Sequence, residues 1–140
     1  MLRLVSYLNS TCEYVMRAAV EPGQAPTLLV YTDSDFASCP YTSKSTSGVV
    51  YVLRTGSSHF PLLWSWKKQS STARSTTEAE LIACASALFG EAPNLHTMIE
   101  SLTEVRVPVS FQQDNQAAVT VIQSEYSASF VSLDESLESM

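Results

Sequence analysis

Thr27-Leu-Leu-Val-Tyr-Thr-Asp33 is the stretch that decides the fold. It is apolar, β-branched and aromatic without a breaker, which predicts a buried strand with Asp33 at its C-terminal end. Two further acidic segments are Ser75-Thr-Thr-Glu78-Ala-Glu80-Leu81, which opens an amphipathic helix, and Phe111-Gln-Gln-Asp114, which closes another apolar run. We therefore expect three carboxylates from distant parts of the sequence to meet at one edge of a sheet.

Hydrophobic patterning predicts the remaining elements. Apolar residues at spacings of three and four predict a helix from Val5 to Ala19, which stops at Glu21-Pro22-Gly23. Strands over 47–53 and 62–67, joined by a turn at 55–58, extend the first strand into an antiparallel meander. Further elements are helices over 79–89, 95–102 and 115–123 and a strand over 107–113. The sequence thus predicts a mixed α/β domain followed by a serine-rich loop.

Charge is distributed unevenly along the chain, whose net charge is −6. Residues 124–140 hold four acidic residues and no basic one, whereas the stretch between Asp35 and Glu78 contains five basic residues and no acidic one. A local basic strip binds phosphates even when the whole chain is acidic. The sequence therefore favours a phosphate-containing partner near residues 44–74.

Cysteine usage and hydropathy exclude several classes of protein. The three cysteines lie far apart and in no C-x-x-C spacing, which argues against a disulfide framework and a zinc site. We therefore expect a reducing compartment, the cytoplasm. No apolar run approaches the roughly 20 residues that span a bilayer, so we expect no membrane partner.

Five short segments carry a resemblance to a known family. They are Tyr31-Thr-Asp-Ser-Asp-Phe-Ala37, Ser45-Thr-Ser-Gly48, Trp64-Ser-Trp-Lys-Lys-Gln69, Arg74-Ser-Thr-Thr-Glu-Ala-Glu-Leu81 and Asp114-Asn-Gln-Ala-Ala118. In order and spacing they resemble the ribonuclease H domain that closes the Pol polyprotein of copia-type LTR retrotransposons. The resemblance implies a ribonuclease H-like mixed sheet at 26–123, a connecting helix from a reverse-transcriptase-like region at 1–22, and an acidic tail at 124–140.

The acidic residues suit the chemistry that this family performs. Phosphodiester hydrolysis must activate a water and stabilise a leaving oxyanion, which two divalent ions about 3.5–4 Å apart accomplish. Mg²⁺ prefers carboxylate oxygens, and Mn²⁺ is an alternative. The resemblance implies Asp33, Glu80 and Asp114 as catalytic metal ligands, an RNA–DNA hybrid as substrate, and the reverse transcriptase domain of the same polyprotein as partner.

Local sequence leaves the choice between Glu78 and Glu80 open. Two helix positions two residues apart differ by about 200° in direction, so only one of the two faces the site. The S-x-x-E capping box starts at Ser75, which makes Glu78 structural, or at Thr77, which makes Glu80 structural. The resemblance favours Glu80 as the ligand, because the family's glutamate precedes a hydrophobic residue.

The aspartates also have ordinary interpretations. Asp33 suits a turn after a strand, and Asp114 suits the N-cap of a helix, although Asn115 is an alternative cap. If the strand continues, Asp35 lies on the same face as Asp33, where it supports the ligands or is solvated.

Residues with substrate-binding potential flank the acidic segments. They are Lys67, Lys68, Arg74, Asn115 and Gln116. Alternation places Trp64 and Trp66 on one strand face with Lys68, and core packing is the ordinary expectation for both tryptophans. Contacts to a hybrid are expected at phosphates and 2′-hydroxyls. His59 and His96 are interpreted as bystanders, since neither has a carboxylate or cysteine partner at ligand spacing.

The chain departs from the family pattern at its C-terminus. Family members continue into a basic, histidine-containing segment and a helix that brings a fourth acidic ligand, for which Asp134 is the available substitute here. One alternative function is therefore an inactive ribonuclease H-fold remnant that serves as a structural or interaction module. A second alternative, an integrase core, requires a later glutamate beyond residue 140.

Overall fold

The structure, a computed structural model, describes residues 2–19, 23–125 and 131–133. Its helices are α1 (Leu2–Ser10), α2 (Thr76–Phe89), α3 (Glu91–Thr103) and α4 (Gln116–Glu125). Its strands are β1 (Thr27–Asp35), β2 (Thr46–Thr55), β3 (Ser58–Lys68), β4 (Val109–Gln112) and β5 (Val131–Leu133). The predicted mixed α/β class is confirmed.

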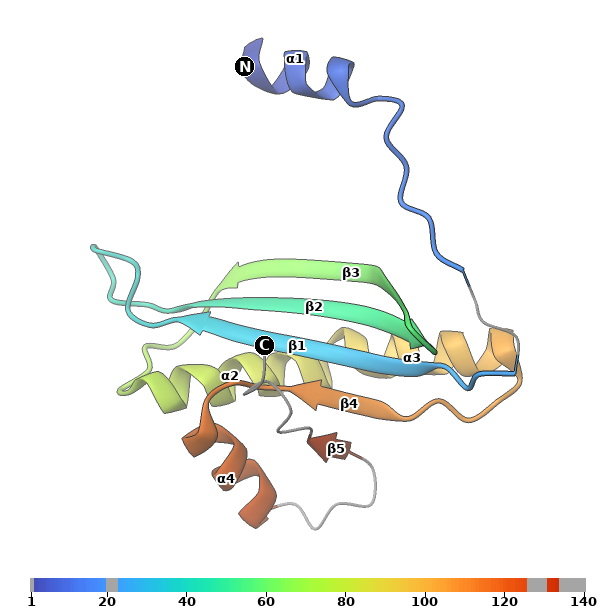
Figure 1. Cartoon of the computed structure of the whole chain (residues 1–140). Coiled ribbons are helices and arrows are strands. Elements are labelled where there is room, and N and C mark those ends of the chain that lie inside the picture. The colour runs from blue at the N-terminus through green and yellow to red at the C-terminus, as the bar shows by residue number, and fades with distance from the viewer. Residues whose placement is uncertain (1, 20–22, 126–130, 134–140) are drawn as a thin grey trace.

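The strands form one sheet in the order β3-β2-β1-β4-β5 (Figure 1). β1, β2 and β3 are antiparallel neighbours, whereas β4 runs parallel to β1 and β5 runs parallel to β4. The helices α2 and α3 provide the connection from β3 to β4. This meander followed by helix, strand and helix is compatible with a ribonuclease H-like fold.

The core lies between the sheet and the α2–α3 pair. Leu28 and Val30 of β1 are fully buried and pack in one cluster with Tyr51 of β2, Phe111 of β4 and Ala87 of α2. Successive side chains of a strand point to opposite faces, so the even-numbered residues of β1 face α2. We call this the inner face of the sheet and the opposite one the outer face.

The hairpin between β2 and β3 closes through two residues, Gly56 and Ser57. Gly56 has a φ of +56°, a conformation that glycine adopts without steric cost and that two-residue hairpins require. The predicted turn is therefore confirmed. It sets the pairing from Thr55 to Val52, and a register shift between Val52 and Tyr51 then places Val50 opposite Trp64.

Several predicted boundaries were wrong. The first helix ends at Ser10 rather than Ala19, and its apolar side chains are exposed, so no packing extends it. The helix expected from residue 95 begins at Glu91, because Pro93 lies in its first turn, where proline is tolerated. β1 extends to Asp35 because it pairs with β2 beyond the end of β4.

The tail differs from the predicted loop at two places. Helix α4 continues to Glu125, and Val131–Leu133 forms β5 by pairing with β4. A parallel edge strand of three residues has too few side chains to leave a pattern in the sequence. Asp134, the suggested fourth ligand, lies outside the described residues. Within the described part of the chain, no helix has the length and apolar character needed to cross a membrane.

Candidate functional site

Two of the predicted acidic residues follow neighbouring parallel strands. The pairing of β1 with β4 ends at Tyr31 and Gln112, and Asp33 and Asp114 each lie two residues farther along. Both aspartates are exposed. The carboxyl ends of β1 and β4 therefore bring the two carboxylates to one edge of the sheet, as predicted.

The third acidic residue, Glu80, is buried on the inner side of the same edge. Its side chain is only 6% exposed and projects from the first turns of α2. Glu80 Oε1 accepts hydrogen bonds from Ser34 Oγ at 2.7 Å and from Ser34 N at 3.2 Å. Glu80 Oε2 accepts one from Gln113 Nε2 at 3.0 Å. Glu80 is thus bonded to the residue after Asp33 and the residue before Asp114.

A wider buried network holds Glu80 in place. Gln113 Nε2 also lies 3.3 Å from Thr32 Oγ1 and 3.3 Å from Cys84 Sγ, and those two atoms are 3.1 Å apart. Glu80 and Cys84 are one helical turn apart on α2, and Thr32 and Ser34 alternate along β1. Sequence reasoning missed this network, although these two spacings were available to find it.

The three carboxylates share an edge but not a face. Ser34 contacts Glu80 on the inner face, so alternation places Asp33 on the outer face. In the ranges that the structure describes, no three His, Cys, Asp or Glu side chains are placed to hold a metal ion. The donor chemistry suits Mg²⁺, since all three groups are carboxylates. The arrangement itself is a buried glutamate linked to two exposed aspartates through their chain neighbours.

Glu78 is part of the cap of α2. Ser75 is the N-cap residue, and its Oγ accepts a hydrogen bond from Glu78 N at 3.1 Å. Glu78 Oε2 accepts from Arg74 N at 2.7 Å rather than from the predicted Ser75 amide. The capping box therefore starts at Ser75, which leaves Glu80 as the glutamate that faces the strand ends.

Asn115, rather than Asp114, caps α4. Asn115 Oδ1 accepts a hydrogen bond from Ala118 N at 3.0 Å, the bond typical of an N-cap residue. Asp114 is consequently not required for the cap. Gln116, which we predicted to bind substrate, is exposed in the first turn of α4.

The predicted basic residues are exposed near the same end of the sheet. Lys67 and Lys68 end β3, and Arg74 precedes α2. Lys68 Nζ lies 3.0 Å from Cys39 Sγ in the loop between β1 and β2. Hydrogen bonds from the Thr42 side chain and from Lys68 lower the pKa of Cys39 to about 6. The Cys39 thiol is thus largely ionised at neutral pH, a feature that sequence reasoning missed.

The expectation that both tryptophans pack in the core was wrong. Trp64 is 63% exposed and Trp66 is 80% exposed. Both project from the outer face of β3, which α2 and α3 do not cover.

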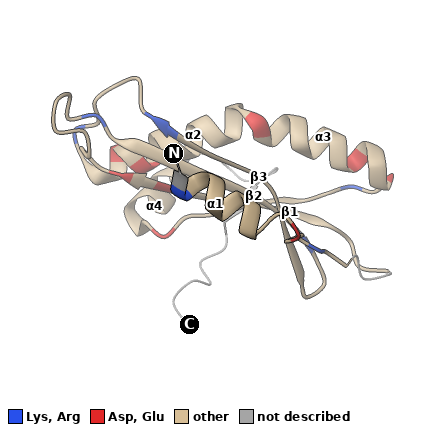
Figure 2. Ribbon diagram, turned by 90° about the horizontal axis from the view of Figure 1, so that it is seen from above, with Lys and Arg blue, Asp and Glu red and all other residues tan. Residues whose placement is uncertain are grey.

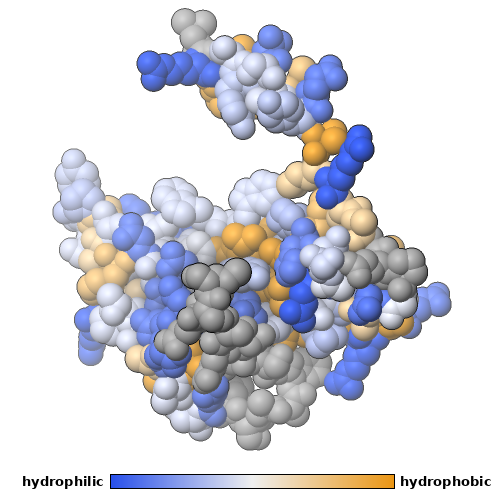
Figure 3. Space-filling view, viewed as in Figure 1, coloured by the Kyte–Doolittle hydropathy of each residue, from blue (hydrophilic) through white to orange (hydrophobic). Residues whose placement is uncertain are grey.

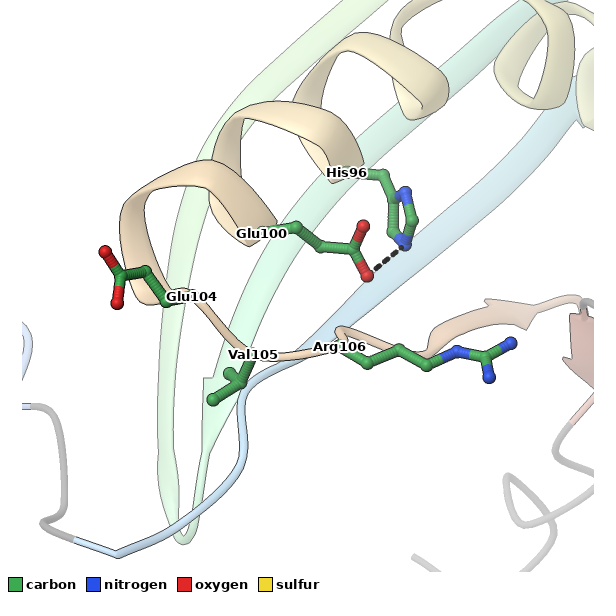
Figure 4. Close-up of a pocket in the computed structure, with 5 residues that line it drawn as sticks. All are labelled: His96, Glu100, Glu104, Val105 and Arg106. Carbon is green, nitrogen blue, oxygen red and sulfur yellow. Dashed lines mark ion pairs between the residues drawn. The ribbon is translucent and has the colours of Figure 1, made fainter.

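A separate pocket of about 480 Å³ lies at the opposite edge of the sheet (Figure 4). Its lining residues are His96, Glu100, Glu104, Val105 and Arg106. His96 Nε2 lies 3.3 Å from Glu100 Oε1 and 2.8 Å from the Val107 carbonyl oxygen. His96 therefore does have a carboxylate partner, contrary to our expectation, and it fastens α3 to the start of β4. None of the three predicted acidic residues, Asp33, Glu80 and Asp114, lines this pocket.

The chain is similar to part of a curated protein named "Retrovirus-related Pol polyprotein from transposon RE2" of Arabidopsis thaliana. The two are 32% identical over 108 residues, which cover 77% of this chain and 7% of that polyprotein. No family model matches the sequence, and no solved structure matches it. The similarity supports a region derived from a retrotransposon Pol polyprotein.

Proposed function

We propose that this chain is a ribonuclease H region of a retrotransposon Pol polyprotein, which cleaves the RNA strand of RNA–DNA hybrids. In this proposal Asp33, Glu80 and Asp114 hold Mg²⁺. The proposal also includes a cytoplasmic location and a reverse transcriptase domain of the same polyprotein as partner. The similarity to a Pol polyprotein and the sheet order support it.

The observation that carries the proposal is the position of Glu80. Its two carboxylate oxygens accept hydrogen bonds from Ser34 and Gln113, the chain neighbours of Asp33 and Asp114. Three acidic residues separated by 47 and 34 positions are thereby coupled at one sheet edge. A buried carboxylate is costly unless it is paired or fully hydrogen-bonded, and here the residues that satisfy it adjoin the other two acids.

The residues have separate tasks in this proposal. Bound Mg²⁺ would activate water and stabilise the leaving oxygen. Asp33 and Asp114 offer exposed carboxylates to the ion, and Glu80 offers the third carboxylate and also orients the two strand ends through Ser34 and Gln113. Lys67, Lys68 and Arg74 neutralise phosphates, and Gln116, in the first turn of α4, adds an exposed amide donor. The side-chain oxygen of Asn115 already caps α4, so only its amide nitrogen would be offered to the substrate.

The proposal is tested with the purified chain and an end-labelled RNA–DNA hybrid, with and without Mg²⁺. We expect RNA cleavage that requires Mg²⁺ and falls roughly 10²- to 10³-fold in Asp33→Asn and in Glu80→Gln. Glu78→Gln is the matched control, because Glu78 is only two residues from Glu80 but acts in the helix cap. Equal losses in Glu78→Gln and Glu80→Gln would contradict the assigned roles.

A second candidate is an inactive ribonuclease H-fold module. It is favoured by the lack of a three-ligand group among the described residues and by the hydrogen bonds that already occupy Glu80. A folded chain that neither cleaves the hybrid nor binds Mg²⁺ in calorimetry would support this module. Mg²⁺-dependent cleavage that Asp33→Asn abolishes would exclude it.

A further inference from the structure

The outer face of the β2–β3 hairpin presents two aromatic rings to solvent. Trp64 and Trp66 alternate with Ser65 and are 63% and 80% exposed. Residues two apart on a strand are separated by about 7 Å, so the two rings form a short ladder along β3. Val50, directly opposite Trp64, is exposed as well. Large exposed aromatic groups of this kind mark binding surfaces.

The space beside the ladder is open. Trp66 lies opposite Gly48, which in turn lies opposite Asp33 on β1. An added Cβ at Gly48 would meet only the Asp33 carbonyl oxygen, at 3.9 Å. Because Gly48 has no side chain, the space above it on the outer face, between Trp66 and Asp33, is open. We call this space the Gly48 gap.

The charge of the hairpin is opposite to that of the chain as a whole. Residues 46–68 contain Arg54, Lys67 and Lys68 and no acidic residue, although the chain carries a net charge of −6 (Figure 2). Alternation places Lys68 on the same face as the two tryptophans. A flexible polyanion with flat apolar groups is the partner that complements stacked aromatic rings next to lysine.

We propose that the outer face of the β2–β3 hairpin binds single-stranded nucleic acid, with bases stacked on Trp64 and Trp66 and a phosphate neutralised by Lys68. Base stacking on aromatic rings requires unstacked bases, which a single strand offers and a duplex does not. The site goes beyond the proposed nuclease, with which it shares Lys68 but none of the three carboxylates. It would hold a single strand next to the Gly48 gap, on whose other side Asp33 lies.

Helix α1 is the competing occupant of this surface. It exposes Leu4, Val5 and Leu8 and stands clear of the sheet, while apolar surface is open over the strands (Figure 3). The charge of α1 argues against this pairing. Its one charged residue is the basic Arg3, which does not complement a basic hairpin.

Intrinsic fluorescence tests the proposal directly, because Trp64 and Trp66 are the two tryptophans of the chain. The probe is oligothymidylate of about 15 nucleotides, added to the full chain in EDTA so that no metal-dependent cleavage contributes. We expect saturable quenching at low salt. An unquenched spectrum at saturating oligonucleotide would overturn the proposal.

Variants are compared by anisotropy of a labelled oligonucleotide. We expect Trp64→Ala and Trp66→Ala each to weaken binding roughly 5- to 100-fold. Tyr41→Ala is the matched control, since Tyr41 is 95% exposed on the loop before β2, and its affinity should change less than about 2-fold. Lys68→Gln should lower the salt slope by about 0.7. Circular dichroism checks that each variant folds.

Three further results would overturn the proposal. One is an equal loss in Tyr41→Ala and Trp66→Ala, and another is equal affinity for a duplex of the same length. The third is a red shift of the tryptophan emission after deletion of residues 1–16, with no nucleic acid present, which would identify α1 as the occupant. Single-strand binding is measured in EDTA and hybrid cleavage in Mg²⁺, so failure of the nuclease proposal and failure of this one are distinguishable.

Discussion

The two faces of β1 differ in chemistry although they alternate along one strand. On the inner face, Thr32 and Ser34 bond to Cys84 and Glu80 of α2. On the outer face, Asp33 and Asp35 are exposed, and the neighbouring tryptophans are exposed as well. A buried polar network is costly when it is left incomplete. At the carboxyl end of β1 the inner face therefore contributes to stability, and the outer face there is free to serve binding and catalysis.

The largest expected contrast between the faces is in cysteine reactivity. In a Cys12→Ser background, iodoacetamide at pH 7 should alkylate Cys39 at least about 100-fold faster than Cys84. Cys39 is ionised beside Thr42 and Lys68, whereas Cys84 is buried in the inner network. Peptide mass spectrometry over time measures both rates. Similar rates would show that the inner face opens readily.

The pH dependence of the Cys39 rate has a defined direction. The pKa of Cys39 is lowered to about 6, so the reactive thiolate prevails above pH 6 and is lost as the pH falls through 6. Lys68→Ala removes one cause of the lowered pKa and should move the midpoint upward. A midpoint at the ordinary value of a free thiol in the unmodified chain would contradict the contact between Lys68 and Cys39.

The next largest expected effect is the difference in unfolding free energy between the variants Glu80→Ala and Asp33→Ala. Glu80→Ala removes the acceptor of the Ser34 hydroxyl and the nearest acceptor of Gln113 Nε2, and it should lower the free energy of unfolding by about 2–4 kcal/mol. Asp33→Ala removes an exposed carboxylate and should change it by less than about 0.5 kcal/mol. Urea denaturation at pH 7 measures both. Equal losses would mean that the two carboxylates share one environment.

Most of the fold was accessible from the sequence because β1 and β2 are apolar, β-branched runs and because α2 follows a capping motif with apolar residues at helical spacing. The boundaries that failed depend on interactions that periodicity does not encode. β1 reaches Asp35 because β2 continues to pair with it, and β5 exists through pairing with β4. Local pattern specifies which residues can form a strand, and pairing specifies where the strand ends.

The site was predictable in position but not in orientation. Patterns at Asp33, Glu80 and Asp114 indicated one sheet edge, since each acid adjoins a strand end or a helix start. Which face each side chain occupies depends on the side to which α2 packs, and the sequence leaves that choice open. The exposure of Trp66 was missed for the same reason, because core packing assumes that both faces of a sheet are covered.

A smaller effect is expected in the helix layer at Gly90, between α2 and α3. A Cβ built at Gly90 would lie 2.4 Å from the Ser86 carbonyl oxygen, so Gly90→Ala forces the backbone to shift. The free energy of unfolding should fall by about 1–3 kcal/mol. Thermal and urea unfolding measure the loss. An unchanged stability would mean that the junction of the two helices adjusts without cost.

The smallest expected effect, of the opposite sign, is at Gly48 on the outer face. Gly48 has room for a Cβ, whose nearest neighbour would be the Asp33 carbonyl oxygen at 3.9 Å, and its backbone is not in the positive-φ region. Gly48→Ala should therefore raise the free energy of unfolding by about 0.4–1 kcal/mol, because it restricts the unfolded chain. The added methyl group of the same variant also fills part of the Gly48 gap between Trp66 and Asp33. Higher stability together with weaker oligonucleotide binding would show that Gly48 serves binding rather than folding. Lower stability would show that the Gly48 gap is not open.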